Sequence, residues 1–337
     1  MKWQKIIFQL SRMHQIKPDN TSLSRAVVLG GAGFIGSNIA QILVAEGYQV
    51  TVIDGLLNRT QGKRSNINGL LDIVTFIDTP VELTIDLADI LRNVDLVIDA
   101  MGWTCHLEAI KDPVYDCQLN LQSHIYAIQS IRLARPKLVI YLGSRHQYGR
   151  VSDDVITEST CCNPVDVQGI HKLAAERHYQ LLAGNEQLNI ISLRFGNTFG
   201  LNQPVNGHDI GLIGTFITAL LSDEPIIVYD GIRRRNCIYA SDIANVILRL
   251  VDKNLTGFCL FNVSGNELNL TELAQKLIEV TGKGVLEIQP MPKEIAAIEV
   301  GSAEFSGLRL ERLIGQDFKM SLIPALEKTL AYFRPHF

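Results

Sequence analysis

The chain has 337 residues, of which 20% are charged and 47% are apolar, and its net charge is −4. This length can bury the core of one large or two modest domains. The lysines and arginines are spread along the chain and form no basic stripe. Because a basic stripe is typical of nucleic-acid-binding proteins, no nucleic-acid partner is expected.

The N-terminal segment 1–24 is basic and partly apolar, but it lacks the long apolar run and the small-residue cleavage site of a secretion signal. We expect an appended arm, with a membrane or partner contact as the alternative. No apolar run reaches the roughly 18–20 residues that span a bilayer, so no integral membrane segment is expected. The six cysteines form no CxxC pair, which predicts reduced thiols, no metal site and a cytoplasmic protein.

Continuous apolar segments alternate with segments of helical period from residue 25 to about residue 200. Continuous apolar runs are typical of strands that are buried on both faces of a sheet. Helical periods occur between them, as in 37–47 and 112–135. The alternation predicts an α/β fold with a Rossmann-type, doubly wound parallel sheet. The predicted strands are 25–30, 48–54, 94–101, 137–143 and 188–195.

The pattern changes after about residue 200, where helices such as "NLTELAQKLIEVTG" mix with short strands and turns that contain Gly or Pro. We expect a smaller C-terminal α/β lobe there that binds substrate. The expected organisation is an arm at 1–24, a dinucleotide-binding domain at 25–200, and a substrate lobe over most of 201–337. Residues of about 236–262 are expected to return to the first domain.

The first predicted strand leads into "GGAGFIGSN", which carries Gly30, Gly33 and Gly36 at GxxGxxG spacing, with Phe34 and Ile35 between the last two. Glycine permits positive φ and lets backbone N–H groups approach a phosphate. The helix that begins in this motif favours negative charge at its N-terminus. A strand before the glycines and a helix after them predict a site for a dinucleotide diphosphate.

Asp54 ends the second predicted strand, 18 residues after Gly36. A carboxylate at this position accepts hydrogen bonds from the adenosine ribose and repels a 2′-phosphate, which favours NAD over NADP. Arg59 and Lys63 follow closely and keep NADP open as the alternative. Asp78 ends a further strand, where it is either a ligand of the adenine amino group or a solvated turn residue.

Five further segments occur in the order of a known family. They are "DPVYDCQLNLQS" with Asn120, "YLGSRHQYG" with Ser144, "LRFGNTFG" with Asn197, "VYDGIRRRNCIYASDIA" with Arg235, and "FNVSGNELNLTELAQKL". Together with the glycine motif they resemble the extended short-chain dehydrogenase/reductase family, especially its nucleotide-sugar epimerases and dehydratases. The resemblance runs from about residue 25 to the C-terminus.

The resemblance implies an enzyme that binds NAD and transfers hydride at a sugar carbinol of a nucleoside-diphosphate sugar, usually at C4. Ala100 would border the cofactor, Lys172 would bind the nicotinamide ribose, and Ser144 would hydrogen-bond the reacting sugar oxygen. Asn197 and Arg235 would hold the substrate phosphates. The family also implies a homodimer formed through helices at 112–135 and 168–183.

One departure puts the chemistry in question, because the family's YxxxK motif is here Gln168 to Lys172. An amide donates and accepts hydrogen bonds but cannot act as a general base at neutral pH. Lys172 itself, a water chain to Lys172, or a nearby histidine would then supply the base. His106, His146 and His171 are the candidates, since an imidazole has a pKa near 6.5.

Three explanations of Gln168 stay open: an enzyme with another base, a deliberate Tyr-to-Gln replacement, or a protein without catalysis. The last would be a non-catalytic protein that binds NAD or a sugar nucleotide. A reductase of a non-sugar carbonyl is a further alternative, which Arg235 argues against. The sequence leaves open the nucleotide, the sugar, and whether the net reaction is epimerisation, dehydration or oxidation.

Overall fold

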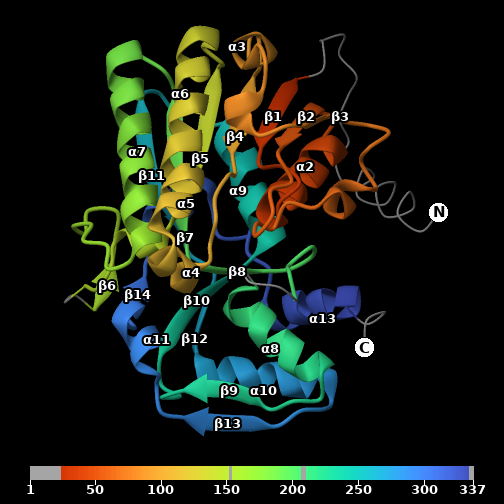
Figure 1. Ribbon diagram of the computed structural model, residues 1–337, viewed down its shortest axis with the longest axis vertical. Helices are drawn as coiled ribbons and strands as arrows, with labels where there is room; N and C mark the ends of the chain where they lie inside the picture. Colours follow the sequence, from red (N-terminus) through yellow and green to blue (C-terminus); the bar gives the residue numbers. More distant parts are fainter. Residues whose placement is uncertain (1–23, 152–153, 206–209, 334–337) are drawn as a thin grey trace.

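The computed structural model describes residues 24–151, 154–205 and 210–333, so the predicted arm lies almost wholly outside the described residues. Its main element is a seven-stranded sheet with the strand order β11-β7-β5-β4-β1-β2-β3, in which every neighbouring pair is parallel (Figure 1). The strands are β1 (Arg25–Leu29), β2 (Gln49–Asp54), β3 (Thr75–Asp78), β4 (Leu96–Asp99), β5 (Leu138–Ser144), β7 (Ile190–Phe195) and β11 (Phe258–Val263).

Helices cover both faces of this sheet, as the uninterrupted apolar strands predict. In β1, Val28 faces one core cluster, while Val27 and Leu29 face the other. The predicted α/β fold with a doubly wound parallel sheet is therefore confirmed. One face carries α2 (Phe34–Ala45), α9 (Ala240–Val251) and α12 (Leu308–Ile314), and the other carries α3 (Leu87–Ile90), α6 (Ser123–Ala134) and α7 (Val167–Glu186).

The helical period predicted over 112–135 corresponds to an uninterrupted helical segment over 113–134, which contains a π turn that the sequence did not predict. The segment consists of α5 (Pro113–Cys117), a π-helical turn (Gln118–Gln122) and α6, and it follows the separate short helix α4 (His106–Lys111). A π turn holds one more residue than an α turn and often lies at a functional site. Here the turn contains Asn120, whose side chain is bonded to the backbone of Trp103.

A smaller lobe follows directly from the carboxyl end of β7, since β8 (Asn197–Phe199) begins two residues after that strand ends. It contains two small sheets and its own apolar core. No helix among the described residues is long and apolar enough to cross a membrane. The other elements of this region are β9 (Ile226–Tyr229), β10 (Arg234–Tyr239), β12 (Asn266–Asn269), β13 (Leu286–Gln289), α8 (Gly211–Leu221), α10 (Leu270–Thr281), α11 (Lys293–Ile298) and α13 (Leu322–Phe333), with the β6–β14 pair (Val155–Ile156, Glu304–Phe305) beside it.

Candidate active site

A cavity of about 570 Å³ lies where the carboxyl ends of the main-sheet strands meet the second lobe. Parallel sheets of this kind bind ligands at that edge. The cavity brings together nearly all of the site residues predicted from the sequence, although they come from distant parts of the chain. They are Gly30, Gly33, Phe34, Ile35, Gly36, Asp54, Ala100, His106, Ser144, His146, Gln168, Lys172, Asn197 and Arg235.

Asp78, predicted as a possible ligand of the adenine amino group, is not in the cavity lining. It pairs in register with Asp54 on the neighbouring strand. Its side chain is 51% exposed and lies 3.9 Å from Nη1 of Arg64. Asp78 is thus a half-exposed carboxylate at the end of β3, and its contact with adenine stays a prediction. His171, also considered as a base, does not line the cavity and instead bonds to Asp116 at 2.6 Å.

The glycine motif forms a tight turn at the start of α2. Gly30 has a φ of +71°, and a Cβ there would lie 2.9 Å from the carbonyl oxygen of Ala100. A Cβ on Gly36 would lie 2.3 Å from the carbonyl oxygen of Gly30, so neither position has room for a side chain. The turn thus exposes backbone at the N-terminus of a 12-residue helix, which suits a diphosphate.

The Asp54 carboxylate both holds this turn and lines the cavity. One oxygen accepts a hydrogen bond from the Ala32 N–H at 2.9 Å, and the other accepts one from Leu56 at 2.9 Å. Burial raises the pKa of Asp54, although these backbone bonds oppose the rise. The geometry fits an acceptor for ribose hydroxyls that is already oriented by the phosphate loop.

Arg59, one of the two cations that left NADP as an alternative cofactor, is held by contacts within the protein. Its Nη1 pairs with Asp112 at 2.8 Å, and its guanidinium stacks over the rings of Trp103 and Tyr115 at 4.8 and 4.5 Å. Such a cation–π arrangement together with an ion pair holds the arginine in place. Arg59 is thus committed to the protein itself, which removes one of the two cations, Arg59 and Lys63, on which the NADP alternative rested.

Replacing Asp54 with Asn is expected to weaken NAD binding about 10- to 100-fold, because hydrogen bonds to a charged group are worth about 1.5–3 kcal/mol. Binding of NADP should weaken less, since the repulsion of a 2′-phosphate disappears. Isothermal titration with both dinucleotides measures the ratio. Glu46→Gln, at an exposed carboxylate beyond α2, is the control. An equal loss for both dinucleotides would show that Asp54 only supports the loop.

Lys172 reaches the cavity from the second turn of α7. Its Nζ donates hydrogen bonds to the carbonyl oxygens of Met101 at 2.9 Å and Leu142 at 3.0 Å. Burial lowers the pKa of Lys172 to about 8, although Asp99 and Asp116 act to raise it. The ammonium is therefore fixed in direction and close to its titration point at physiological pH.

Gln168 is held by the loop after β4. Its Nε2 donates to the Trp103 carbonyl oxygen at 2.8 Å, and Asn120 bonds to both the N–H and the carbonyl oxygen of Trp103. Only an amide nitrogen can donate to a carbonyl, which fixes the amide orientation. The Gln168 amide oxygen is left as an acceptor in the cavity wall.

Ser144 ends β5 beside Gln168 and Lys172 in the lining. Its Oγ accepts the His146 N–H at 3.2 Å, while its own N–H donates to Oε1 of Gln147 at 2.7 Å. The hydroxyl proton of Ser144 thus remains for donation to a ligand oxygen.

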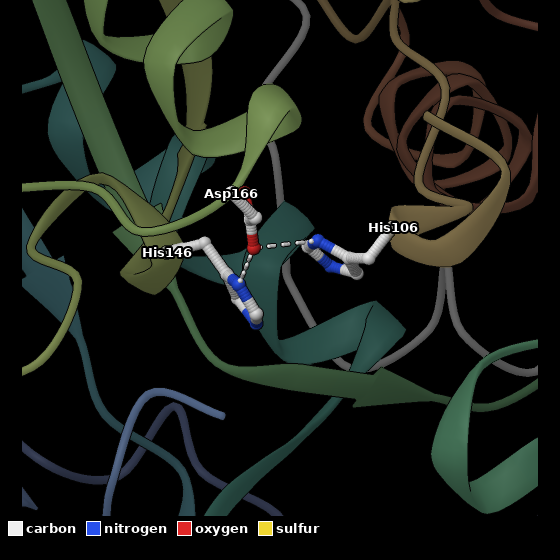
Figure 2. A group of neighbouring side chains, drawn as sticks. All are labelled: His106, His146 and Asp166. Carbon is white, nitrogen blue, oxygen red and sulfur yellow. Dashed lines mark hydrogen bonds and ion pairs between the residues drawn. The ribbon is translucent and has the colours of Figure 1, made fainter. Parts of the chain in front are cut away.

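His106 and His146 share one carboxylate, that of Asp166 (Figure 2). The Nδ1 atoms lie 3.0 Å (His106) and 2.7 Å (His146) from Oδ2 of Asp166, and the two rings stack with centroids 3.9 Å apart. Burial and His106 lower the pKa of His146 to about 4, against the attraction of Asp166. Burial alone would raise the pKa of Asp166, but the two histidines hold it well below its usual range.

Asp166 was not singled out from the sequence. Its other oxygen, Oδ1, caps α7 by accepting the Gly169 N–H at 2.6 Å. Aspartate just before a helical period is an N-cap signal, so its position could have been predicted. Its contact with two histidines from other parts of the chain could not.

Three arginines line the end of the cavity formed by the second lobe. Arg235 forms a two-pronged pair with Glu299, with Nη2 at 2.6 and 2.7 Å from its two oxygens. Arg233 binds the same carboxylate, and Arg145 lies within 3.4 Å of the Val300 carbonyl oxygen. One carboxylate among three guanidinium groups leaves a net positive charge, which suits an anionic ligand. The part played by Arg145, Arg233 and Glu299 was not predicted.

A family model described as "NAD dependent epimerase/dehydratase family" matches residues 26–264. A protein of Methanocaldococcus jannaschii that is provisionally named UDP-glucose 4-epimerase is 28% identical over 253 residues, which are 73% of this chain and 79% of the relative.

Solved structures with the same fold cover most of the chain. The UDP-N-acetylglucosamine 4-epimerase of Methanobrevibacter ruminantium M1, in complex with UDP-N-acetylmuramic acid, has a TM-score of 0.83 at 23% identity and covers 94% of this chain and 100% of its own. The dTDP-glucose 4,6-dehydratase DesIV of Streptomyces venezuelae, with NAD and TYD bound, has a TM-score of 0.82 at 23% identity and covers 92% and 97%.

Proposed function

The chain belongs to the NAD dependent epimerase/dehydratase family, and from this premise we propose that it is an NAD-dependent enzyme acting on a nucleoside-diphosphate sugar. The observation that carries the proposal is a single cavity with a glycine turn and Asp54 at one end, Lys172 in its wall and arginines at the other end. The first end suits a dinucleotide and the last suits a second diphosphate.

The residues present fit NAD. Gly30, Gly33 and Gly36 leave the backbone bare for the diphosphate, Asp54 is oriented to accept the ribose hydroxyls, and Lys172 would bind the nicotinamide ribose. When bound, NAD supplies hydride transfer at a sugar carbinol carbon.

At the substrate end, Arg235 would hold the diphosphate and Asn197 would add a hydrogen bond. Ser144 would donate its hydroxyl proton to the reacting sugar oxygen. Gln168 replaces the tyrosine expected from the family, and its amide oxygen can accept a hydrogen bond from a hydroxyl group but cannot take the proton. The proton must then pass to another group in the cavity wall.

A non-catalytic protein that binds NAD or sugar nucleotides is the second candidate, since the same turn, Asp54 and Arg235 would serve binding alone. The enzyme is favoured because titratable groups with shifted pKa values, among them His146 and Lys172, gather in one cavity.

The proposal is tested by incubating the protein and NAD with UDP-glucose, UDP-N-acetylglucosamine, UDP-glucuronic acid and dTDP-glucose, and analysing the products by NMR. Conversion of at least one sugar nucleotide is expected. Epimerisation or dehydration would leave NAD unconsumed, whereas net oxidation would raise the absorbance of NADH. Tight binding of NAD and sugar nucleotide without any product would support the second candidate.

We also propose a homodimer through α6 and α7, as the family resemblance implies. Each helix carries a large apolar side chain exposed near its C-terminal end, namely Leu133 with 62% and Leu181 with 61% of its surface accessible. Ile125 and Ile128, also on α6, are half-buried within the subunit. Exposed leucines on two adjacent helices suit an interface between copies.

The double change Leu133→Glu and Leu181→Glu is expected to convert the dimer to a monomer, because four carboxylates would be buried without partners. Light scattering after size-exclusion chromatography measures the mass. Ile73→Glu, at a position that is 58% exposed before β3, is the control and should remain dimeric. A wild-type protein that is already monomeric would contradict the proposed dimer.

A further inference from the structure

We propose that His146, Asp166 and His106 form a proton relay that replaces the missing phenol, with His146 taking the proton of the reacting sugar hydroxyl. This inference rests on the proposed function. Asp166 orients His146 and compensates its charge, and His106 covers the outer face of the ring. The three residues come from separate parts of the chain and meet beside the cavity (Figure 2).

The tautomer of His146 follows from the charge of Asp166. A carboxylate accepts hydrogen bonds and repels a nitrogen lone pair, so an imidazole nitrogen that faces it must carry hydrogen. Nδ1 of His146 makes a hydrogen bond of 2.7 Å with Oδ2 of Asp166, while Nδ1 of His106 lies 3.0 Å from the same oxygen. In neutral His146 the lone pair is therefore on Nε2, which is the atom that can accept a proton.

His146 rather than His106 is placed to receive the proton. Its Nδ1 makes a hydrogen bond with Asp166, whereas Nδ1 of His106 lies close to the carboxylate without alignment for a hydrogen bond. The backbone N–H of His146 also donates a hydrogen bond to Oγ of Ser144. His146 is therefore next to the hydroxyl group that is proposed to bind the sugar oxygen.

The turn that follows β5 and carries His146 lies directly against the start of α7, where Gln168 is located. A Cβ on Gly169 would lie 2.7 Å from the carbonyl oxygen of His146 and 3.0 Å from Oδ1 of Asp166. Only glycine permits this approach. It brings His146, Asp166 and Gln168 into one neighbourhood, so a proton that Gln168 cannot take has an acceptor nearby.

A metal ion is the other occupant that two histidines and a carboxylate suggest, because one ligand atom from each lies within 4.8 Å of the others. The distances argue against it. The Nδ1 atoms lie 2.7 Å (His146) and 3.0 Å (His106) from Oδ2 of Asp166, whereas two ligands bound at about 2.0 Å to one tetrahedral ion are about 3.3 Å apart. Stacked rings that share one carboxylate suit a single proton instead.

In the proposed step, the sugar O–H bond breaks and its proton forms an N–H bond with Nε2 of His146. The O–H electron pair becomes the second bond of the new carbonyl group, and bound NAD would supply the acceptor for the hydrogen of that carbon and its electron pair. The imidazolium is then stabilised by Asp166 and returns the proton when the carbonyl is reduced again.

The charged groups that act on His146 are Asp166, His106 and Arg145, with Lys172 and Glu299 in the same cavity lining. Asp166→Asn removes a negative charge and should move the acid limb of the kcat/KM profile to lower pH. Asparagine keeps the helix cap. His106→Gln removes a neighbour that disfavours the imidazolium, so the limb should move to higher pH. These opposite shifts are not expected of residues that only support the structure.

The experiment measures kcat/KM from pH 3 to 9.5, a range that includes the lowered pKa of His146 near 4, on whichever sugar nucleotide of the panel is converted. We expect His146→Gln to lose the acid limb and about 10²- to 10⁴-fold in kcat/KM, the usual contribution of a general base. His178→Gln, at an exposed histidine of α7, is the matched control. Unchanged profiles in an active enzyme would overturn the relay and leave the proposed function standing, as would one equivalent of zinc in the purified protein.

A second readout does not need activity. NMR titration of ring-labelled histidine, with the His146 signal assigned from its disappearance in His146→Gln, gives the imidazole pKa directly. It should fall in Asp166→Asn and rise in His106→Gln. If no sugar nucleotide is converted, these shifts still test the electrostatic coupling, and shifts of the same sign in both variants would overturn it.

Discussion

Lys172→Met is expected to lower kcat/KM about 10³-fold, within the range that acid–base and positioning groups contribute, and to weaken NAD binding as well. The Lys172 ammonium is fixed by two backbone carbonyls in the cavity wall, where the nicotinamide ribose is proposed to lie. Methionine fills much of the same space but neither donates a hydrogen bond nor carries charge. Steady-state kinetics and NAD titration measure the two losses separately.

The expected change of kcat/KM with pH follows from the titration of Lys172. Because burial lowers the pKa of Lys172 to about 8, the ammonium is present below that pH and is lost as the pH rises through it. The wild-type kcat/KM should therefore fall on the alkaline side near pH 8, and Lys172→Met should lack that limb. Lys137→Met, at a side chain that is 80% exposed, is the control. A full alkaline limb in Lys172→Met would contradict the role of the ammonium.

Arg235→Ala is expected to raise KM for the sugar nucleotide about 30-fold or more, since a charge-assisted pair costs about 2 kcal/mol or more when broken. Arg235 lines the cavity with its side chain only 12% exposed, and Glu299 holds its guanidinium in place. NAD affinity should not change, because the proposed dinucleotide site lies at the other end of the cavity.

The neighbouring arginine on β10 offers a matched control. Successive side chains of a strand point to opposite faces, and Arg234 is accordingly 54% exposed and paired with Glu267. Arg234→Ala should leave KM unchanged. Equal effects of the two replacements would show that the general positive charge of this region attracts the substrate. They would contradict specific binding of the diphosphate by Arg235.

Local patterns in the sequence were sufficient to predict the fold. Continuous apolar strands, helical periods between them and a glycine turn at the first crossover are local features, and together they define a doubly wound parallel sheet. The same topology brings the ends of β1 and β5 to one edge, so Gly30 and Ser144 were expected to meet, and the family resemblance added Arg235. All three line one cavity.

The rest depends on contacts that no local pattern encodes. The π turn inside the helical segment 113–134 accompanies the bonds between Asn120 and the Trp103 backbone. The carboxylate between two histidines requires that α4, the end of β5 and the start of α7 converge. Glu299 meets Arg235 across 64 residues of sequence. Each of these is set by tertiary packing, so candidate histidines could be named from the sequence but not ranked.

The most direct test of the account is a crystal structure of the protein with NAD and a UDP-sugar. The diphosphate of NAD should lie on the turn of Gly30 to Gly36, with its adenosine ribose on Asp54 and its nicotinamide end at Lys172. The sugar hydroxyl should lie between Ser144, Gln168 and His146. A cavity that stays empty at saturating NAD, or that holds a different kind of ligand in the glycine turn, would contradict the proposed function.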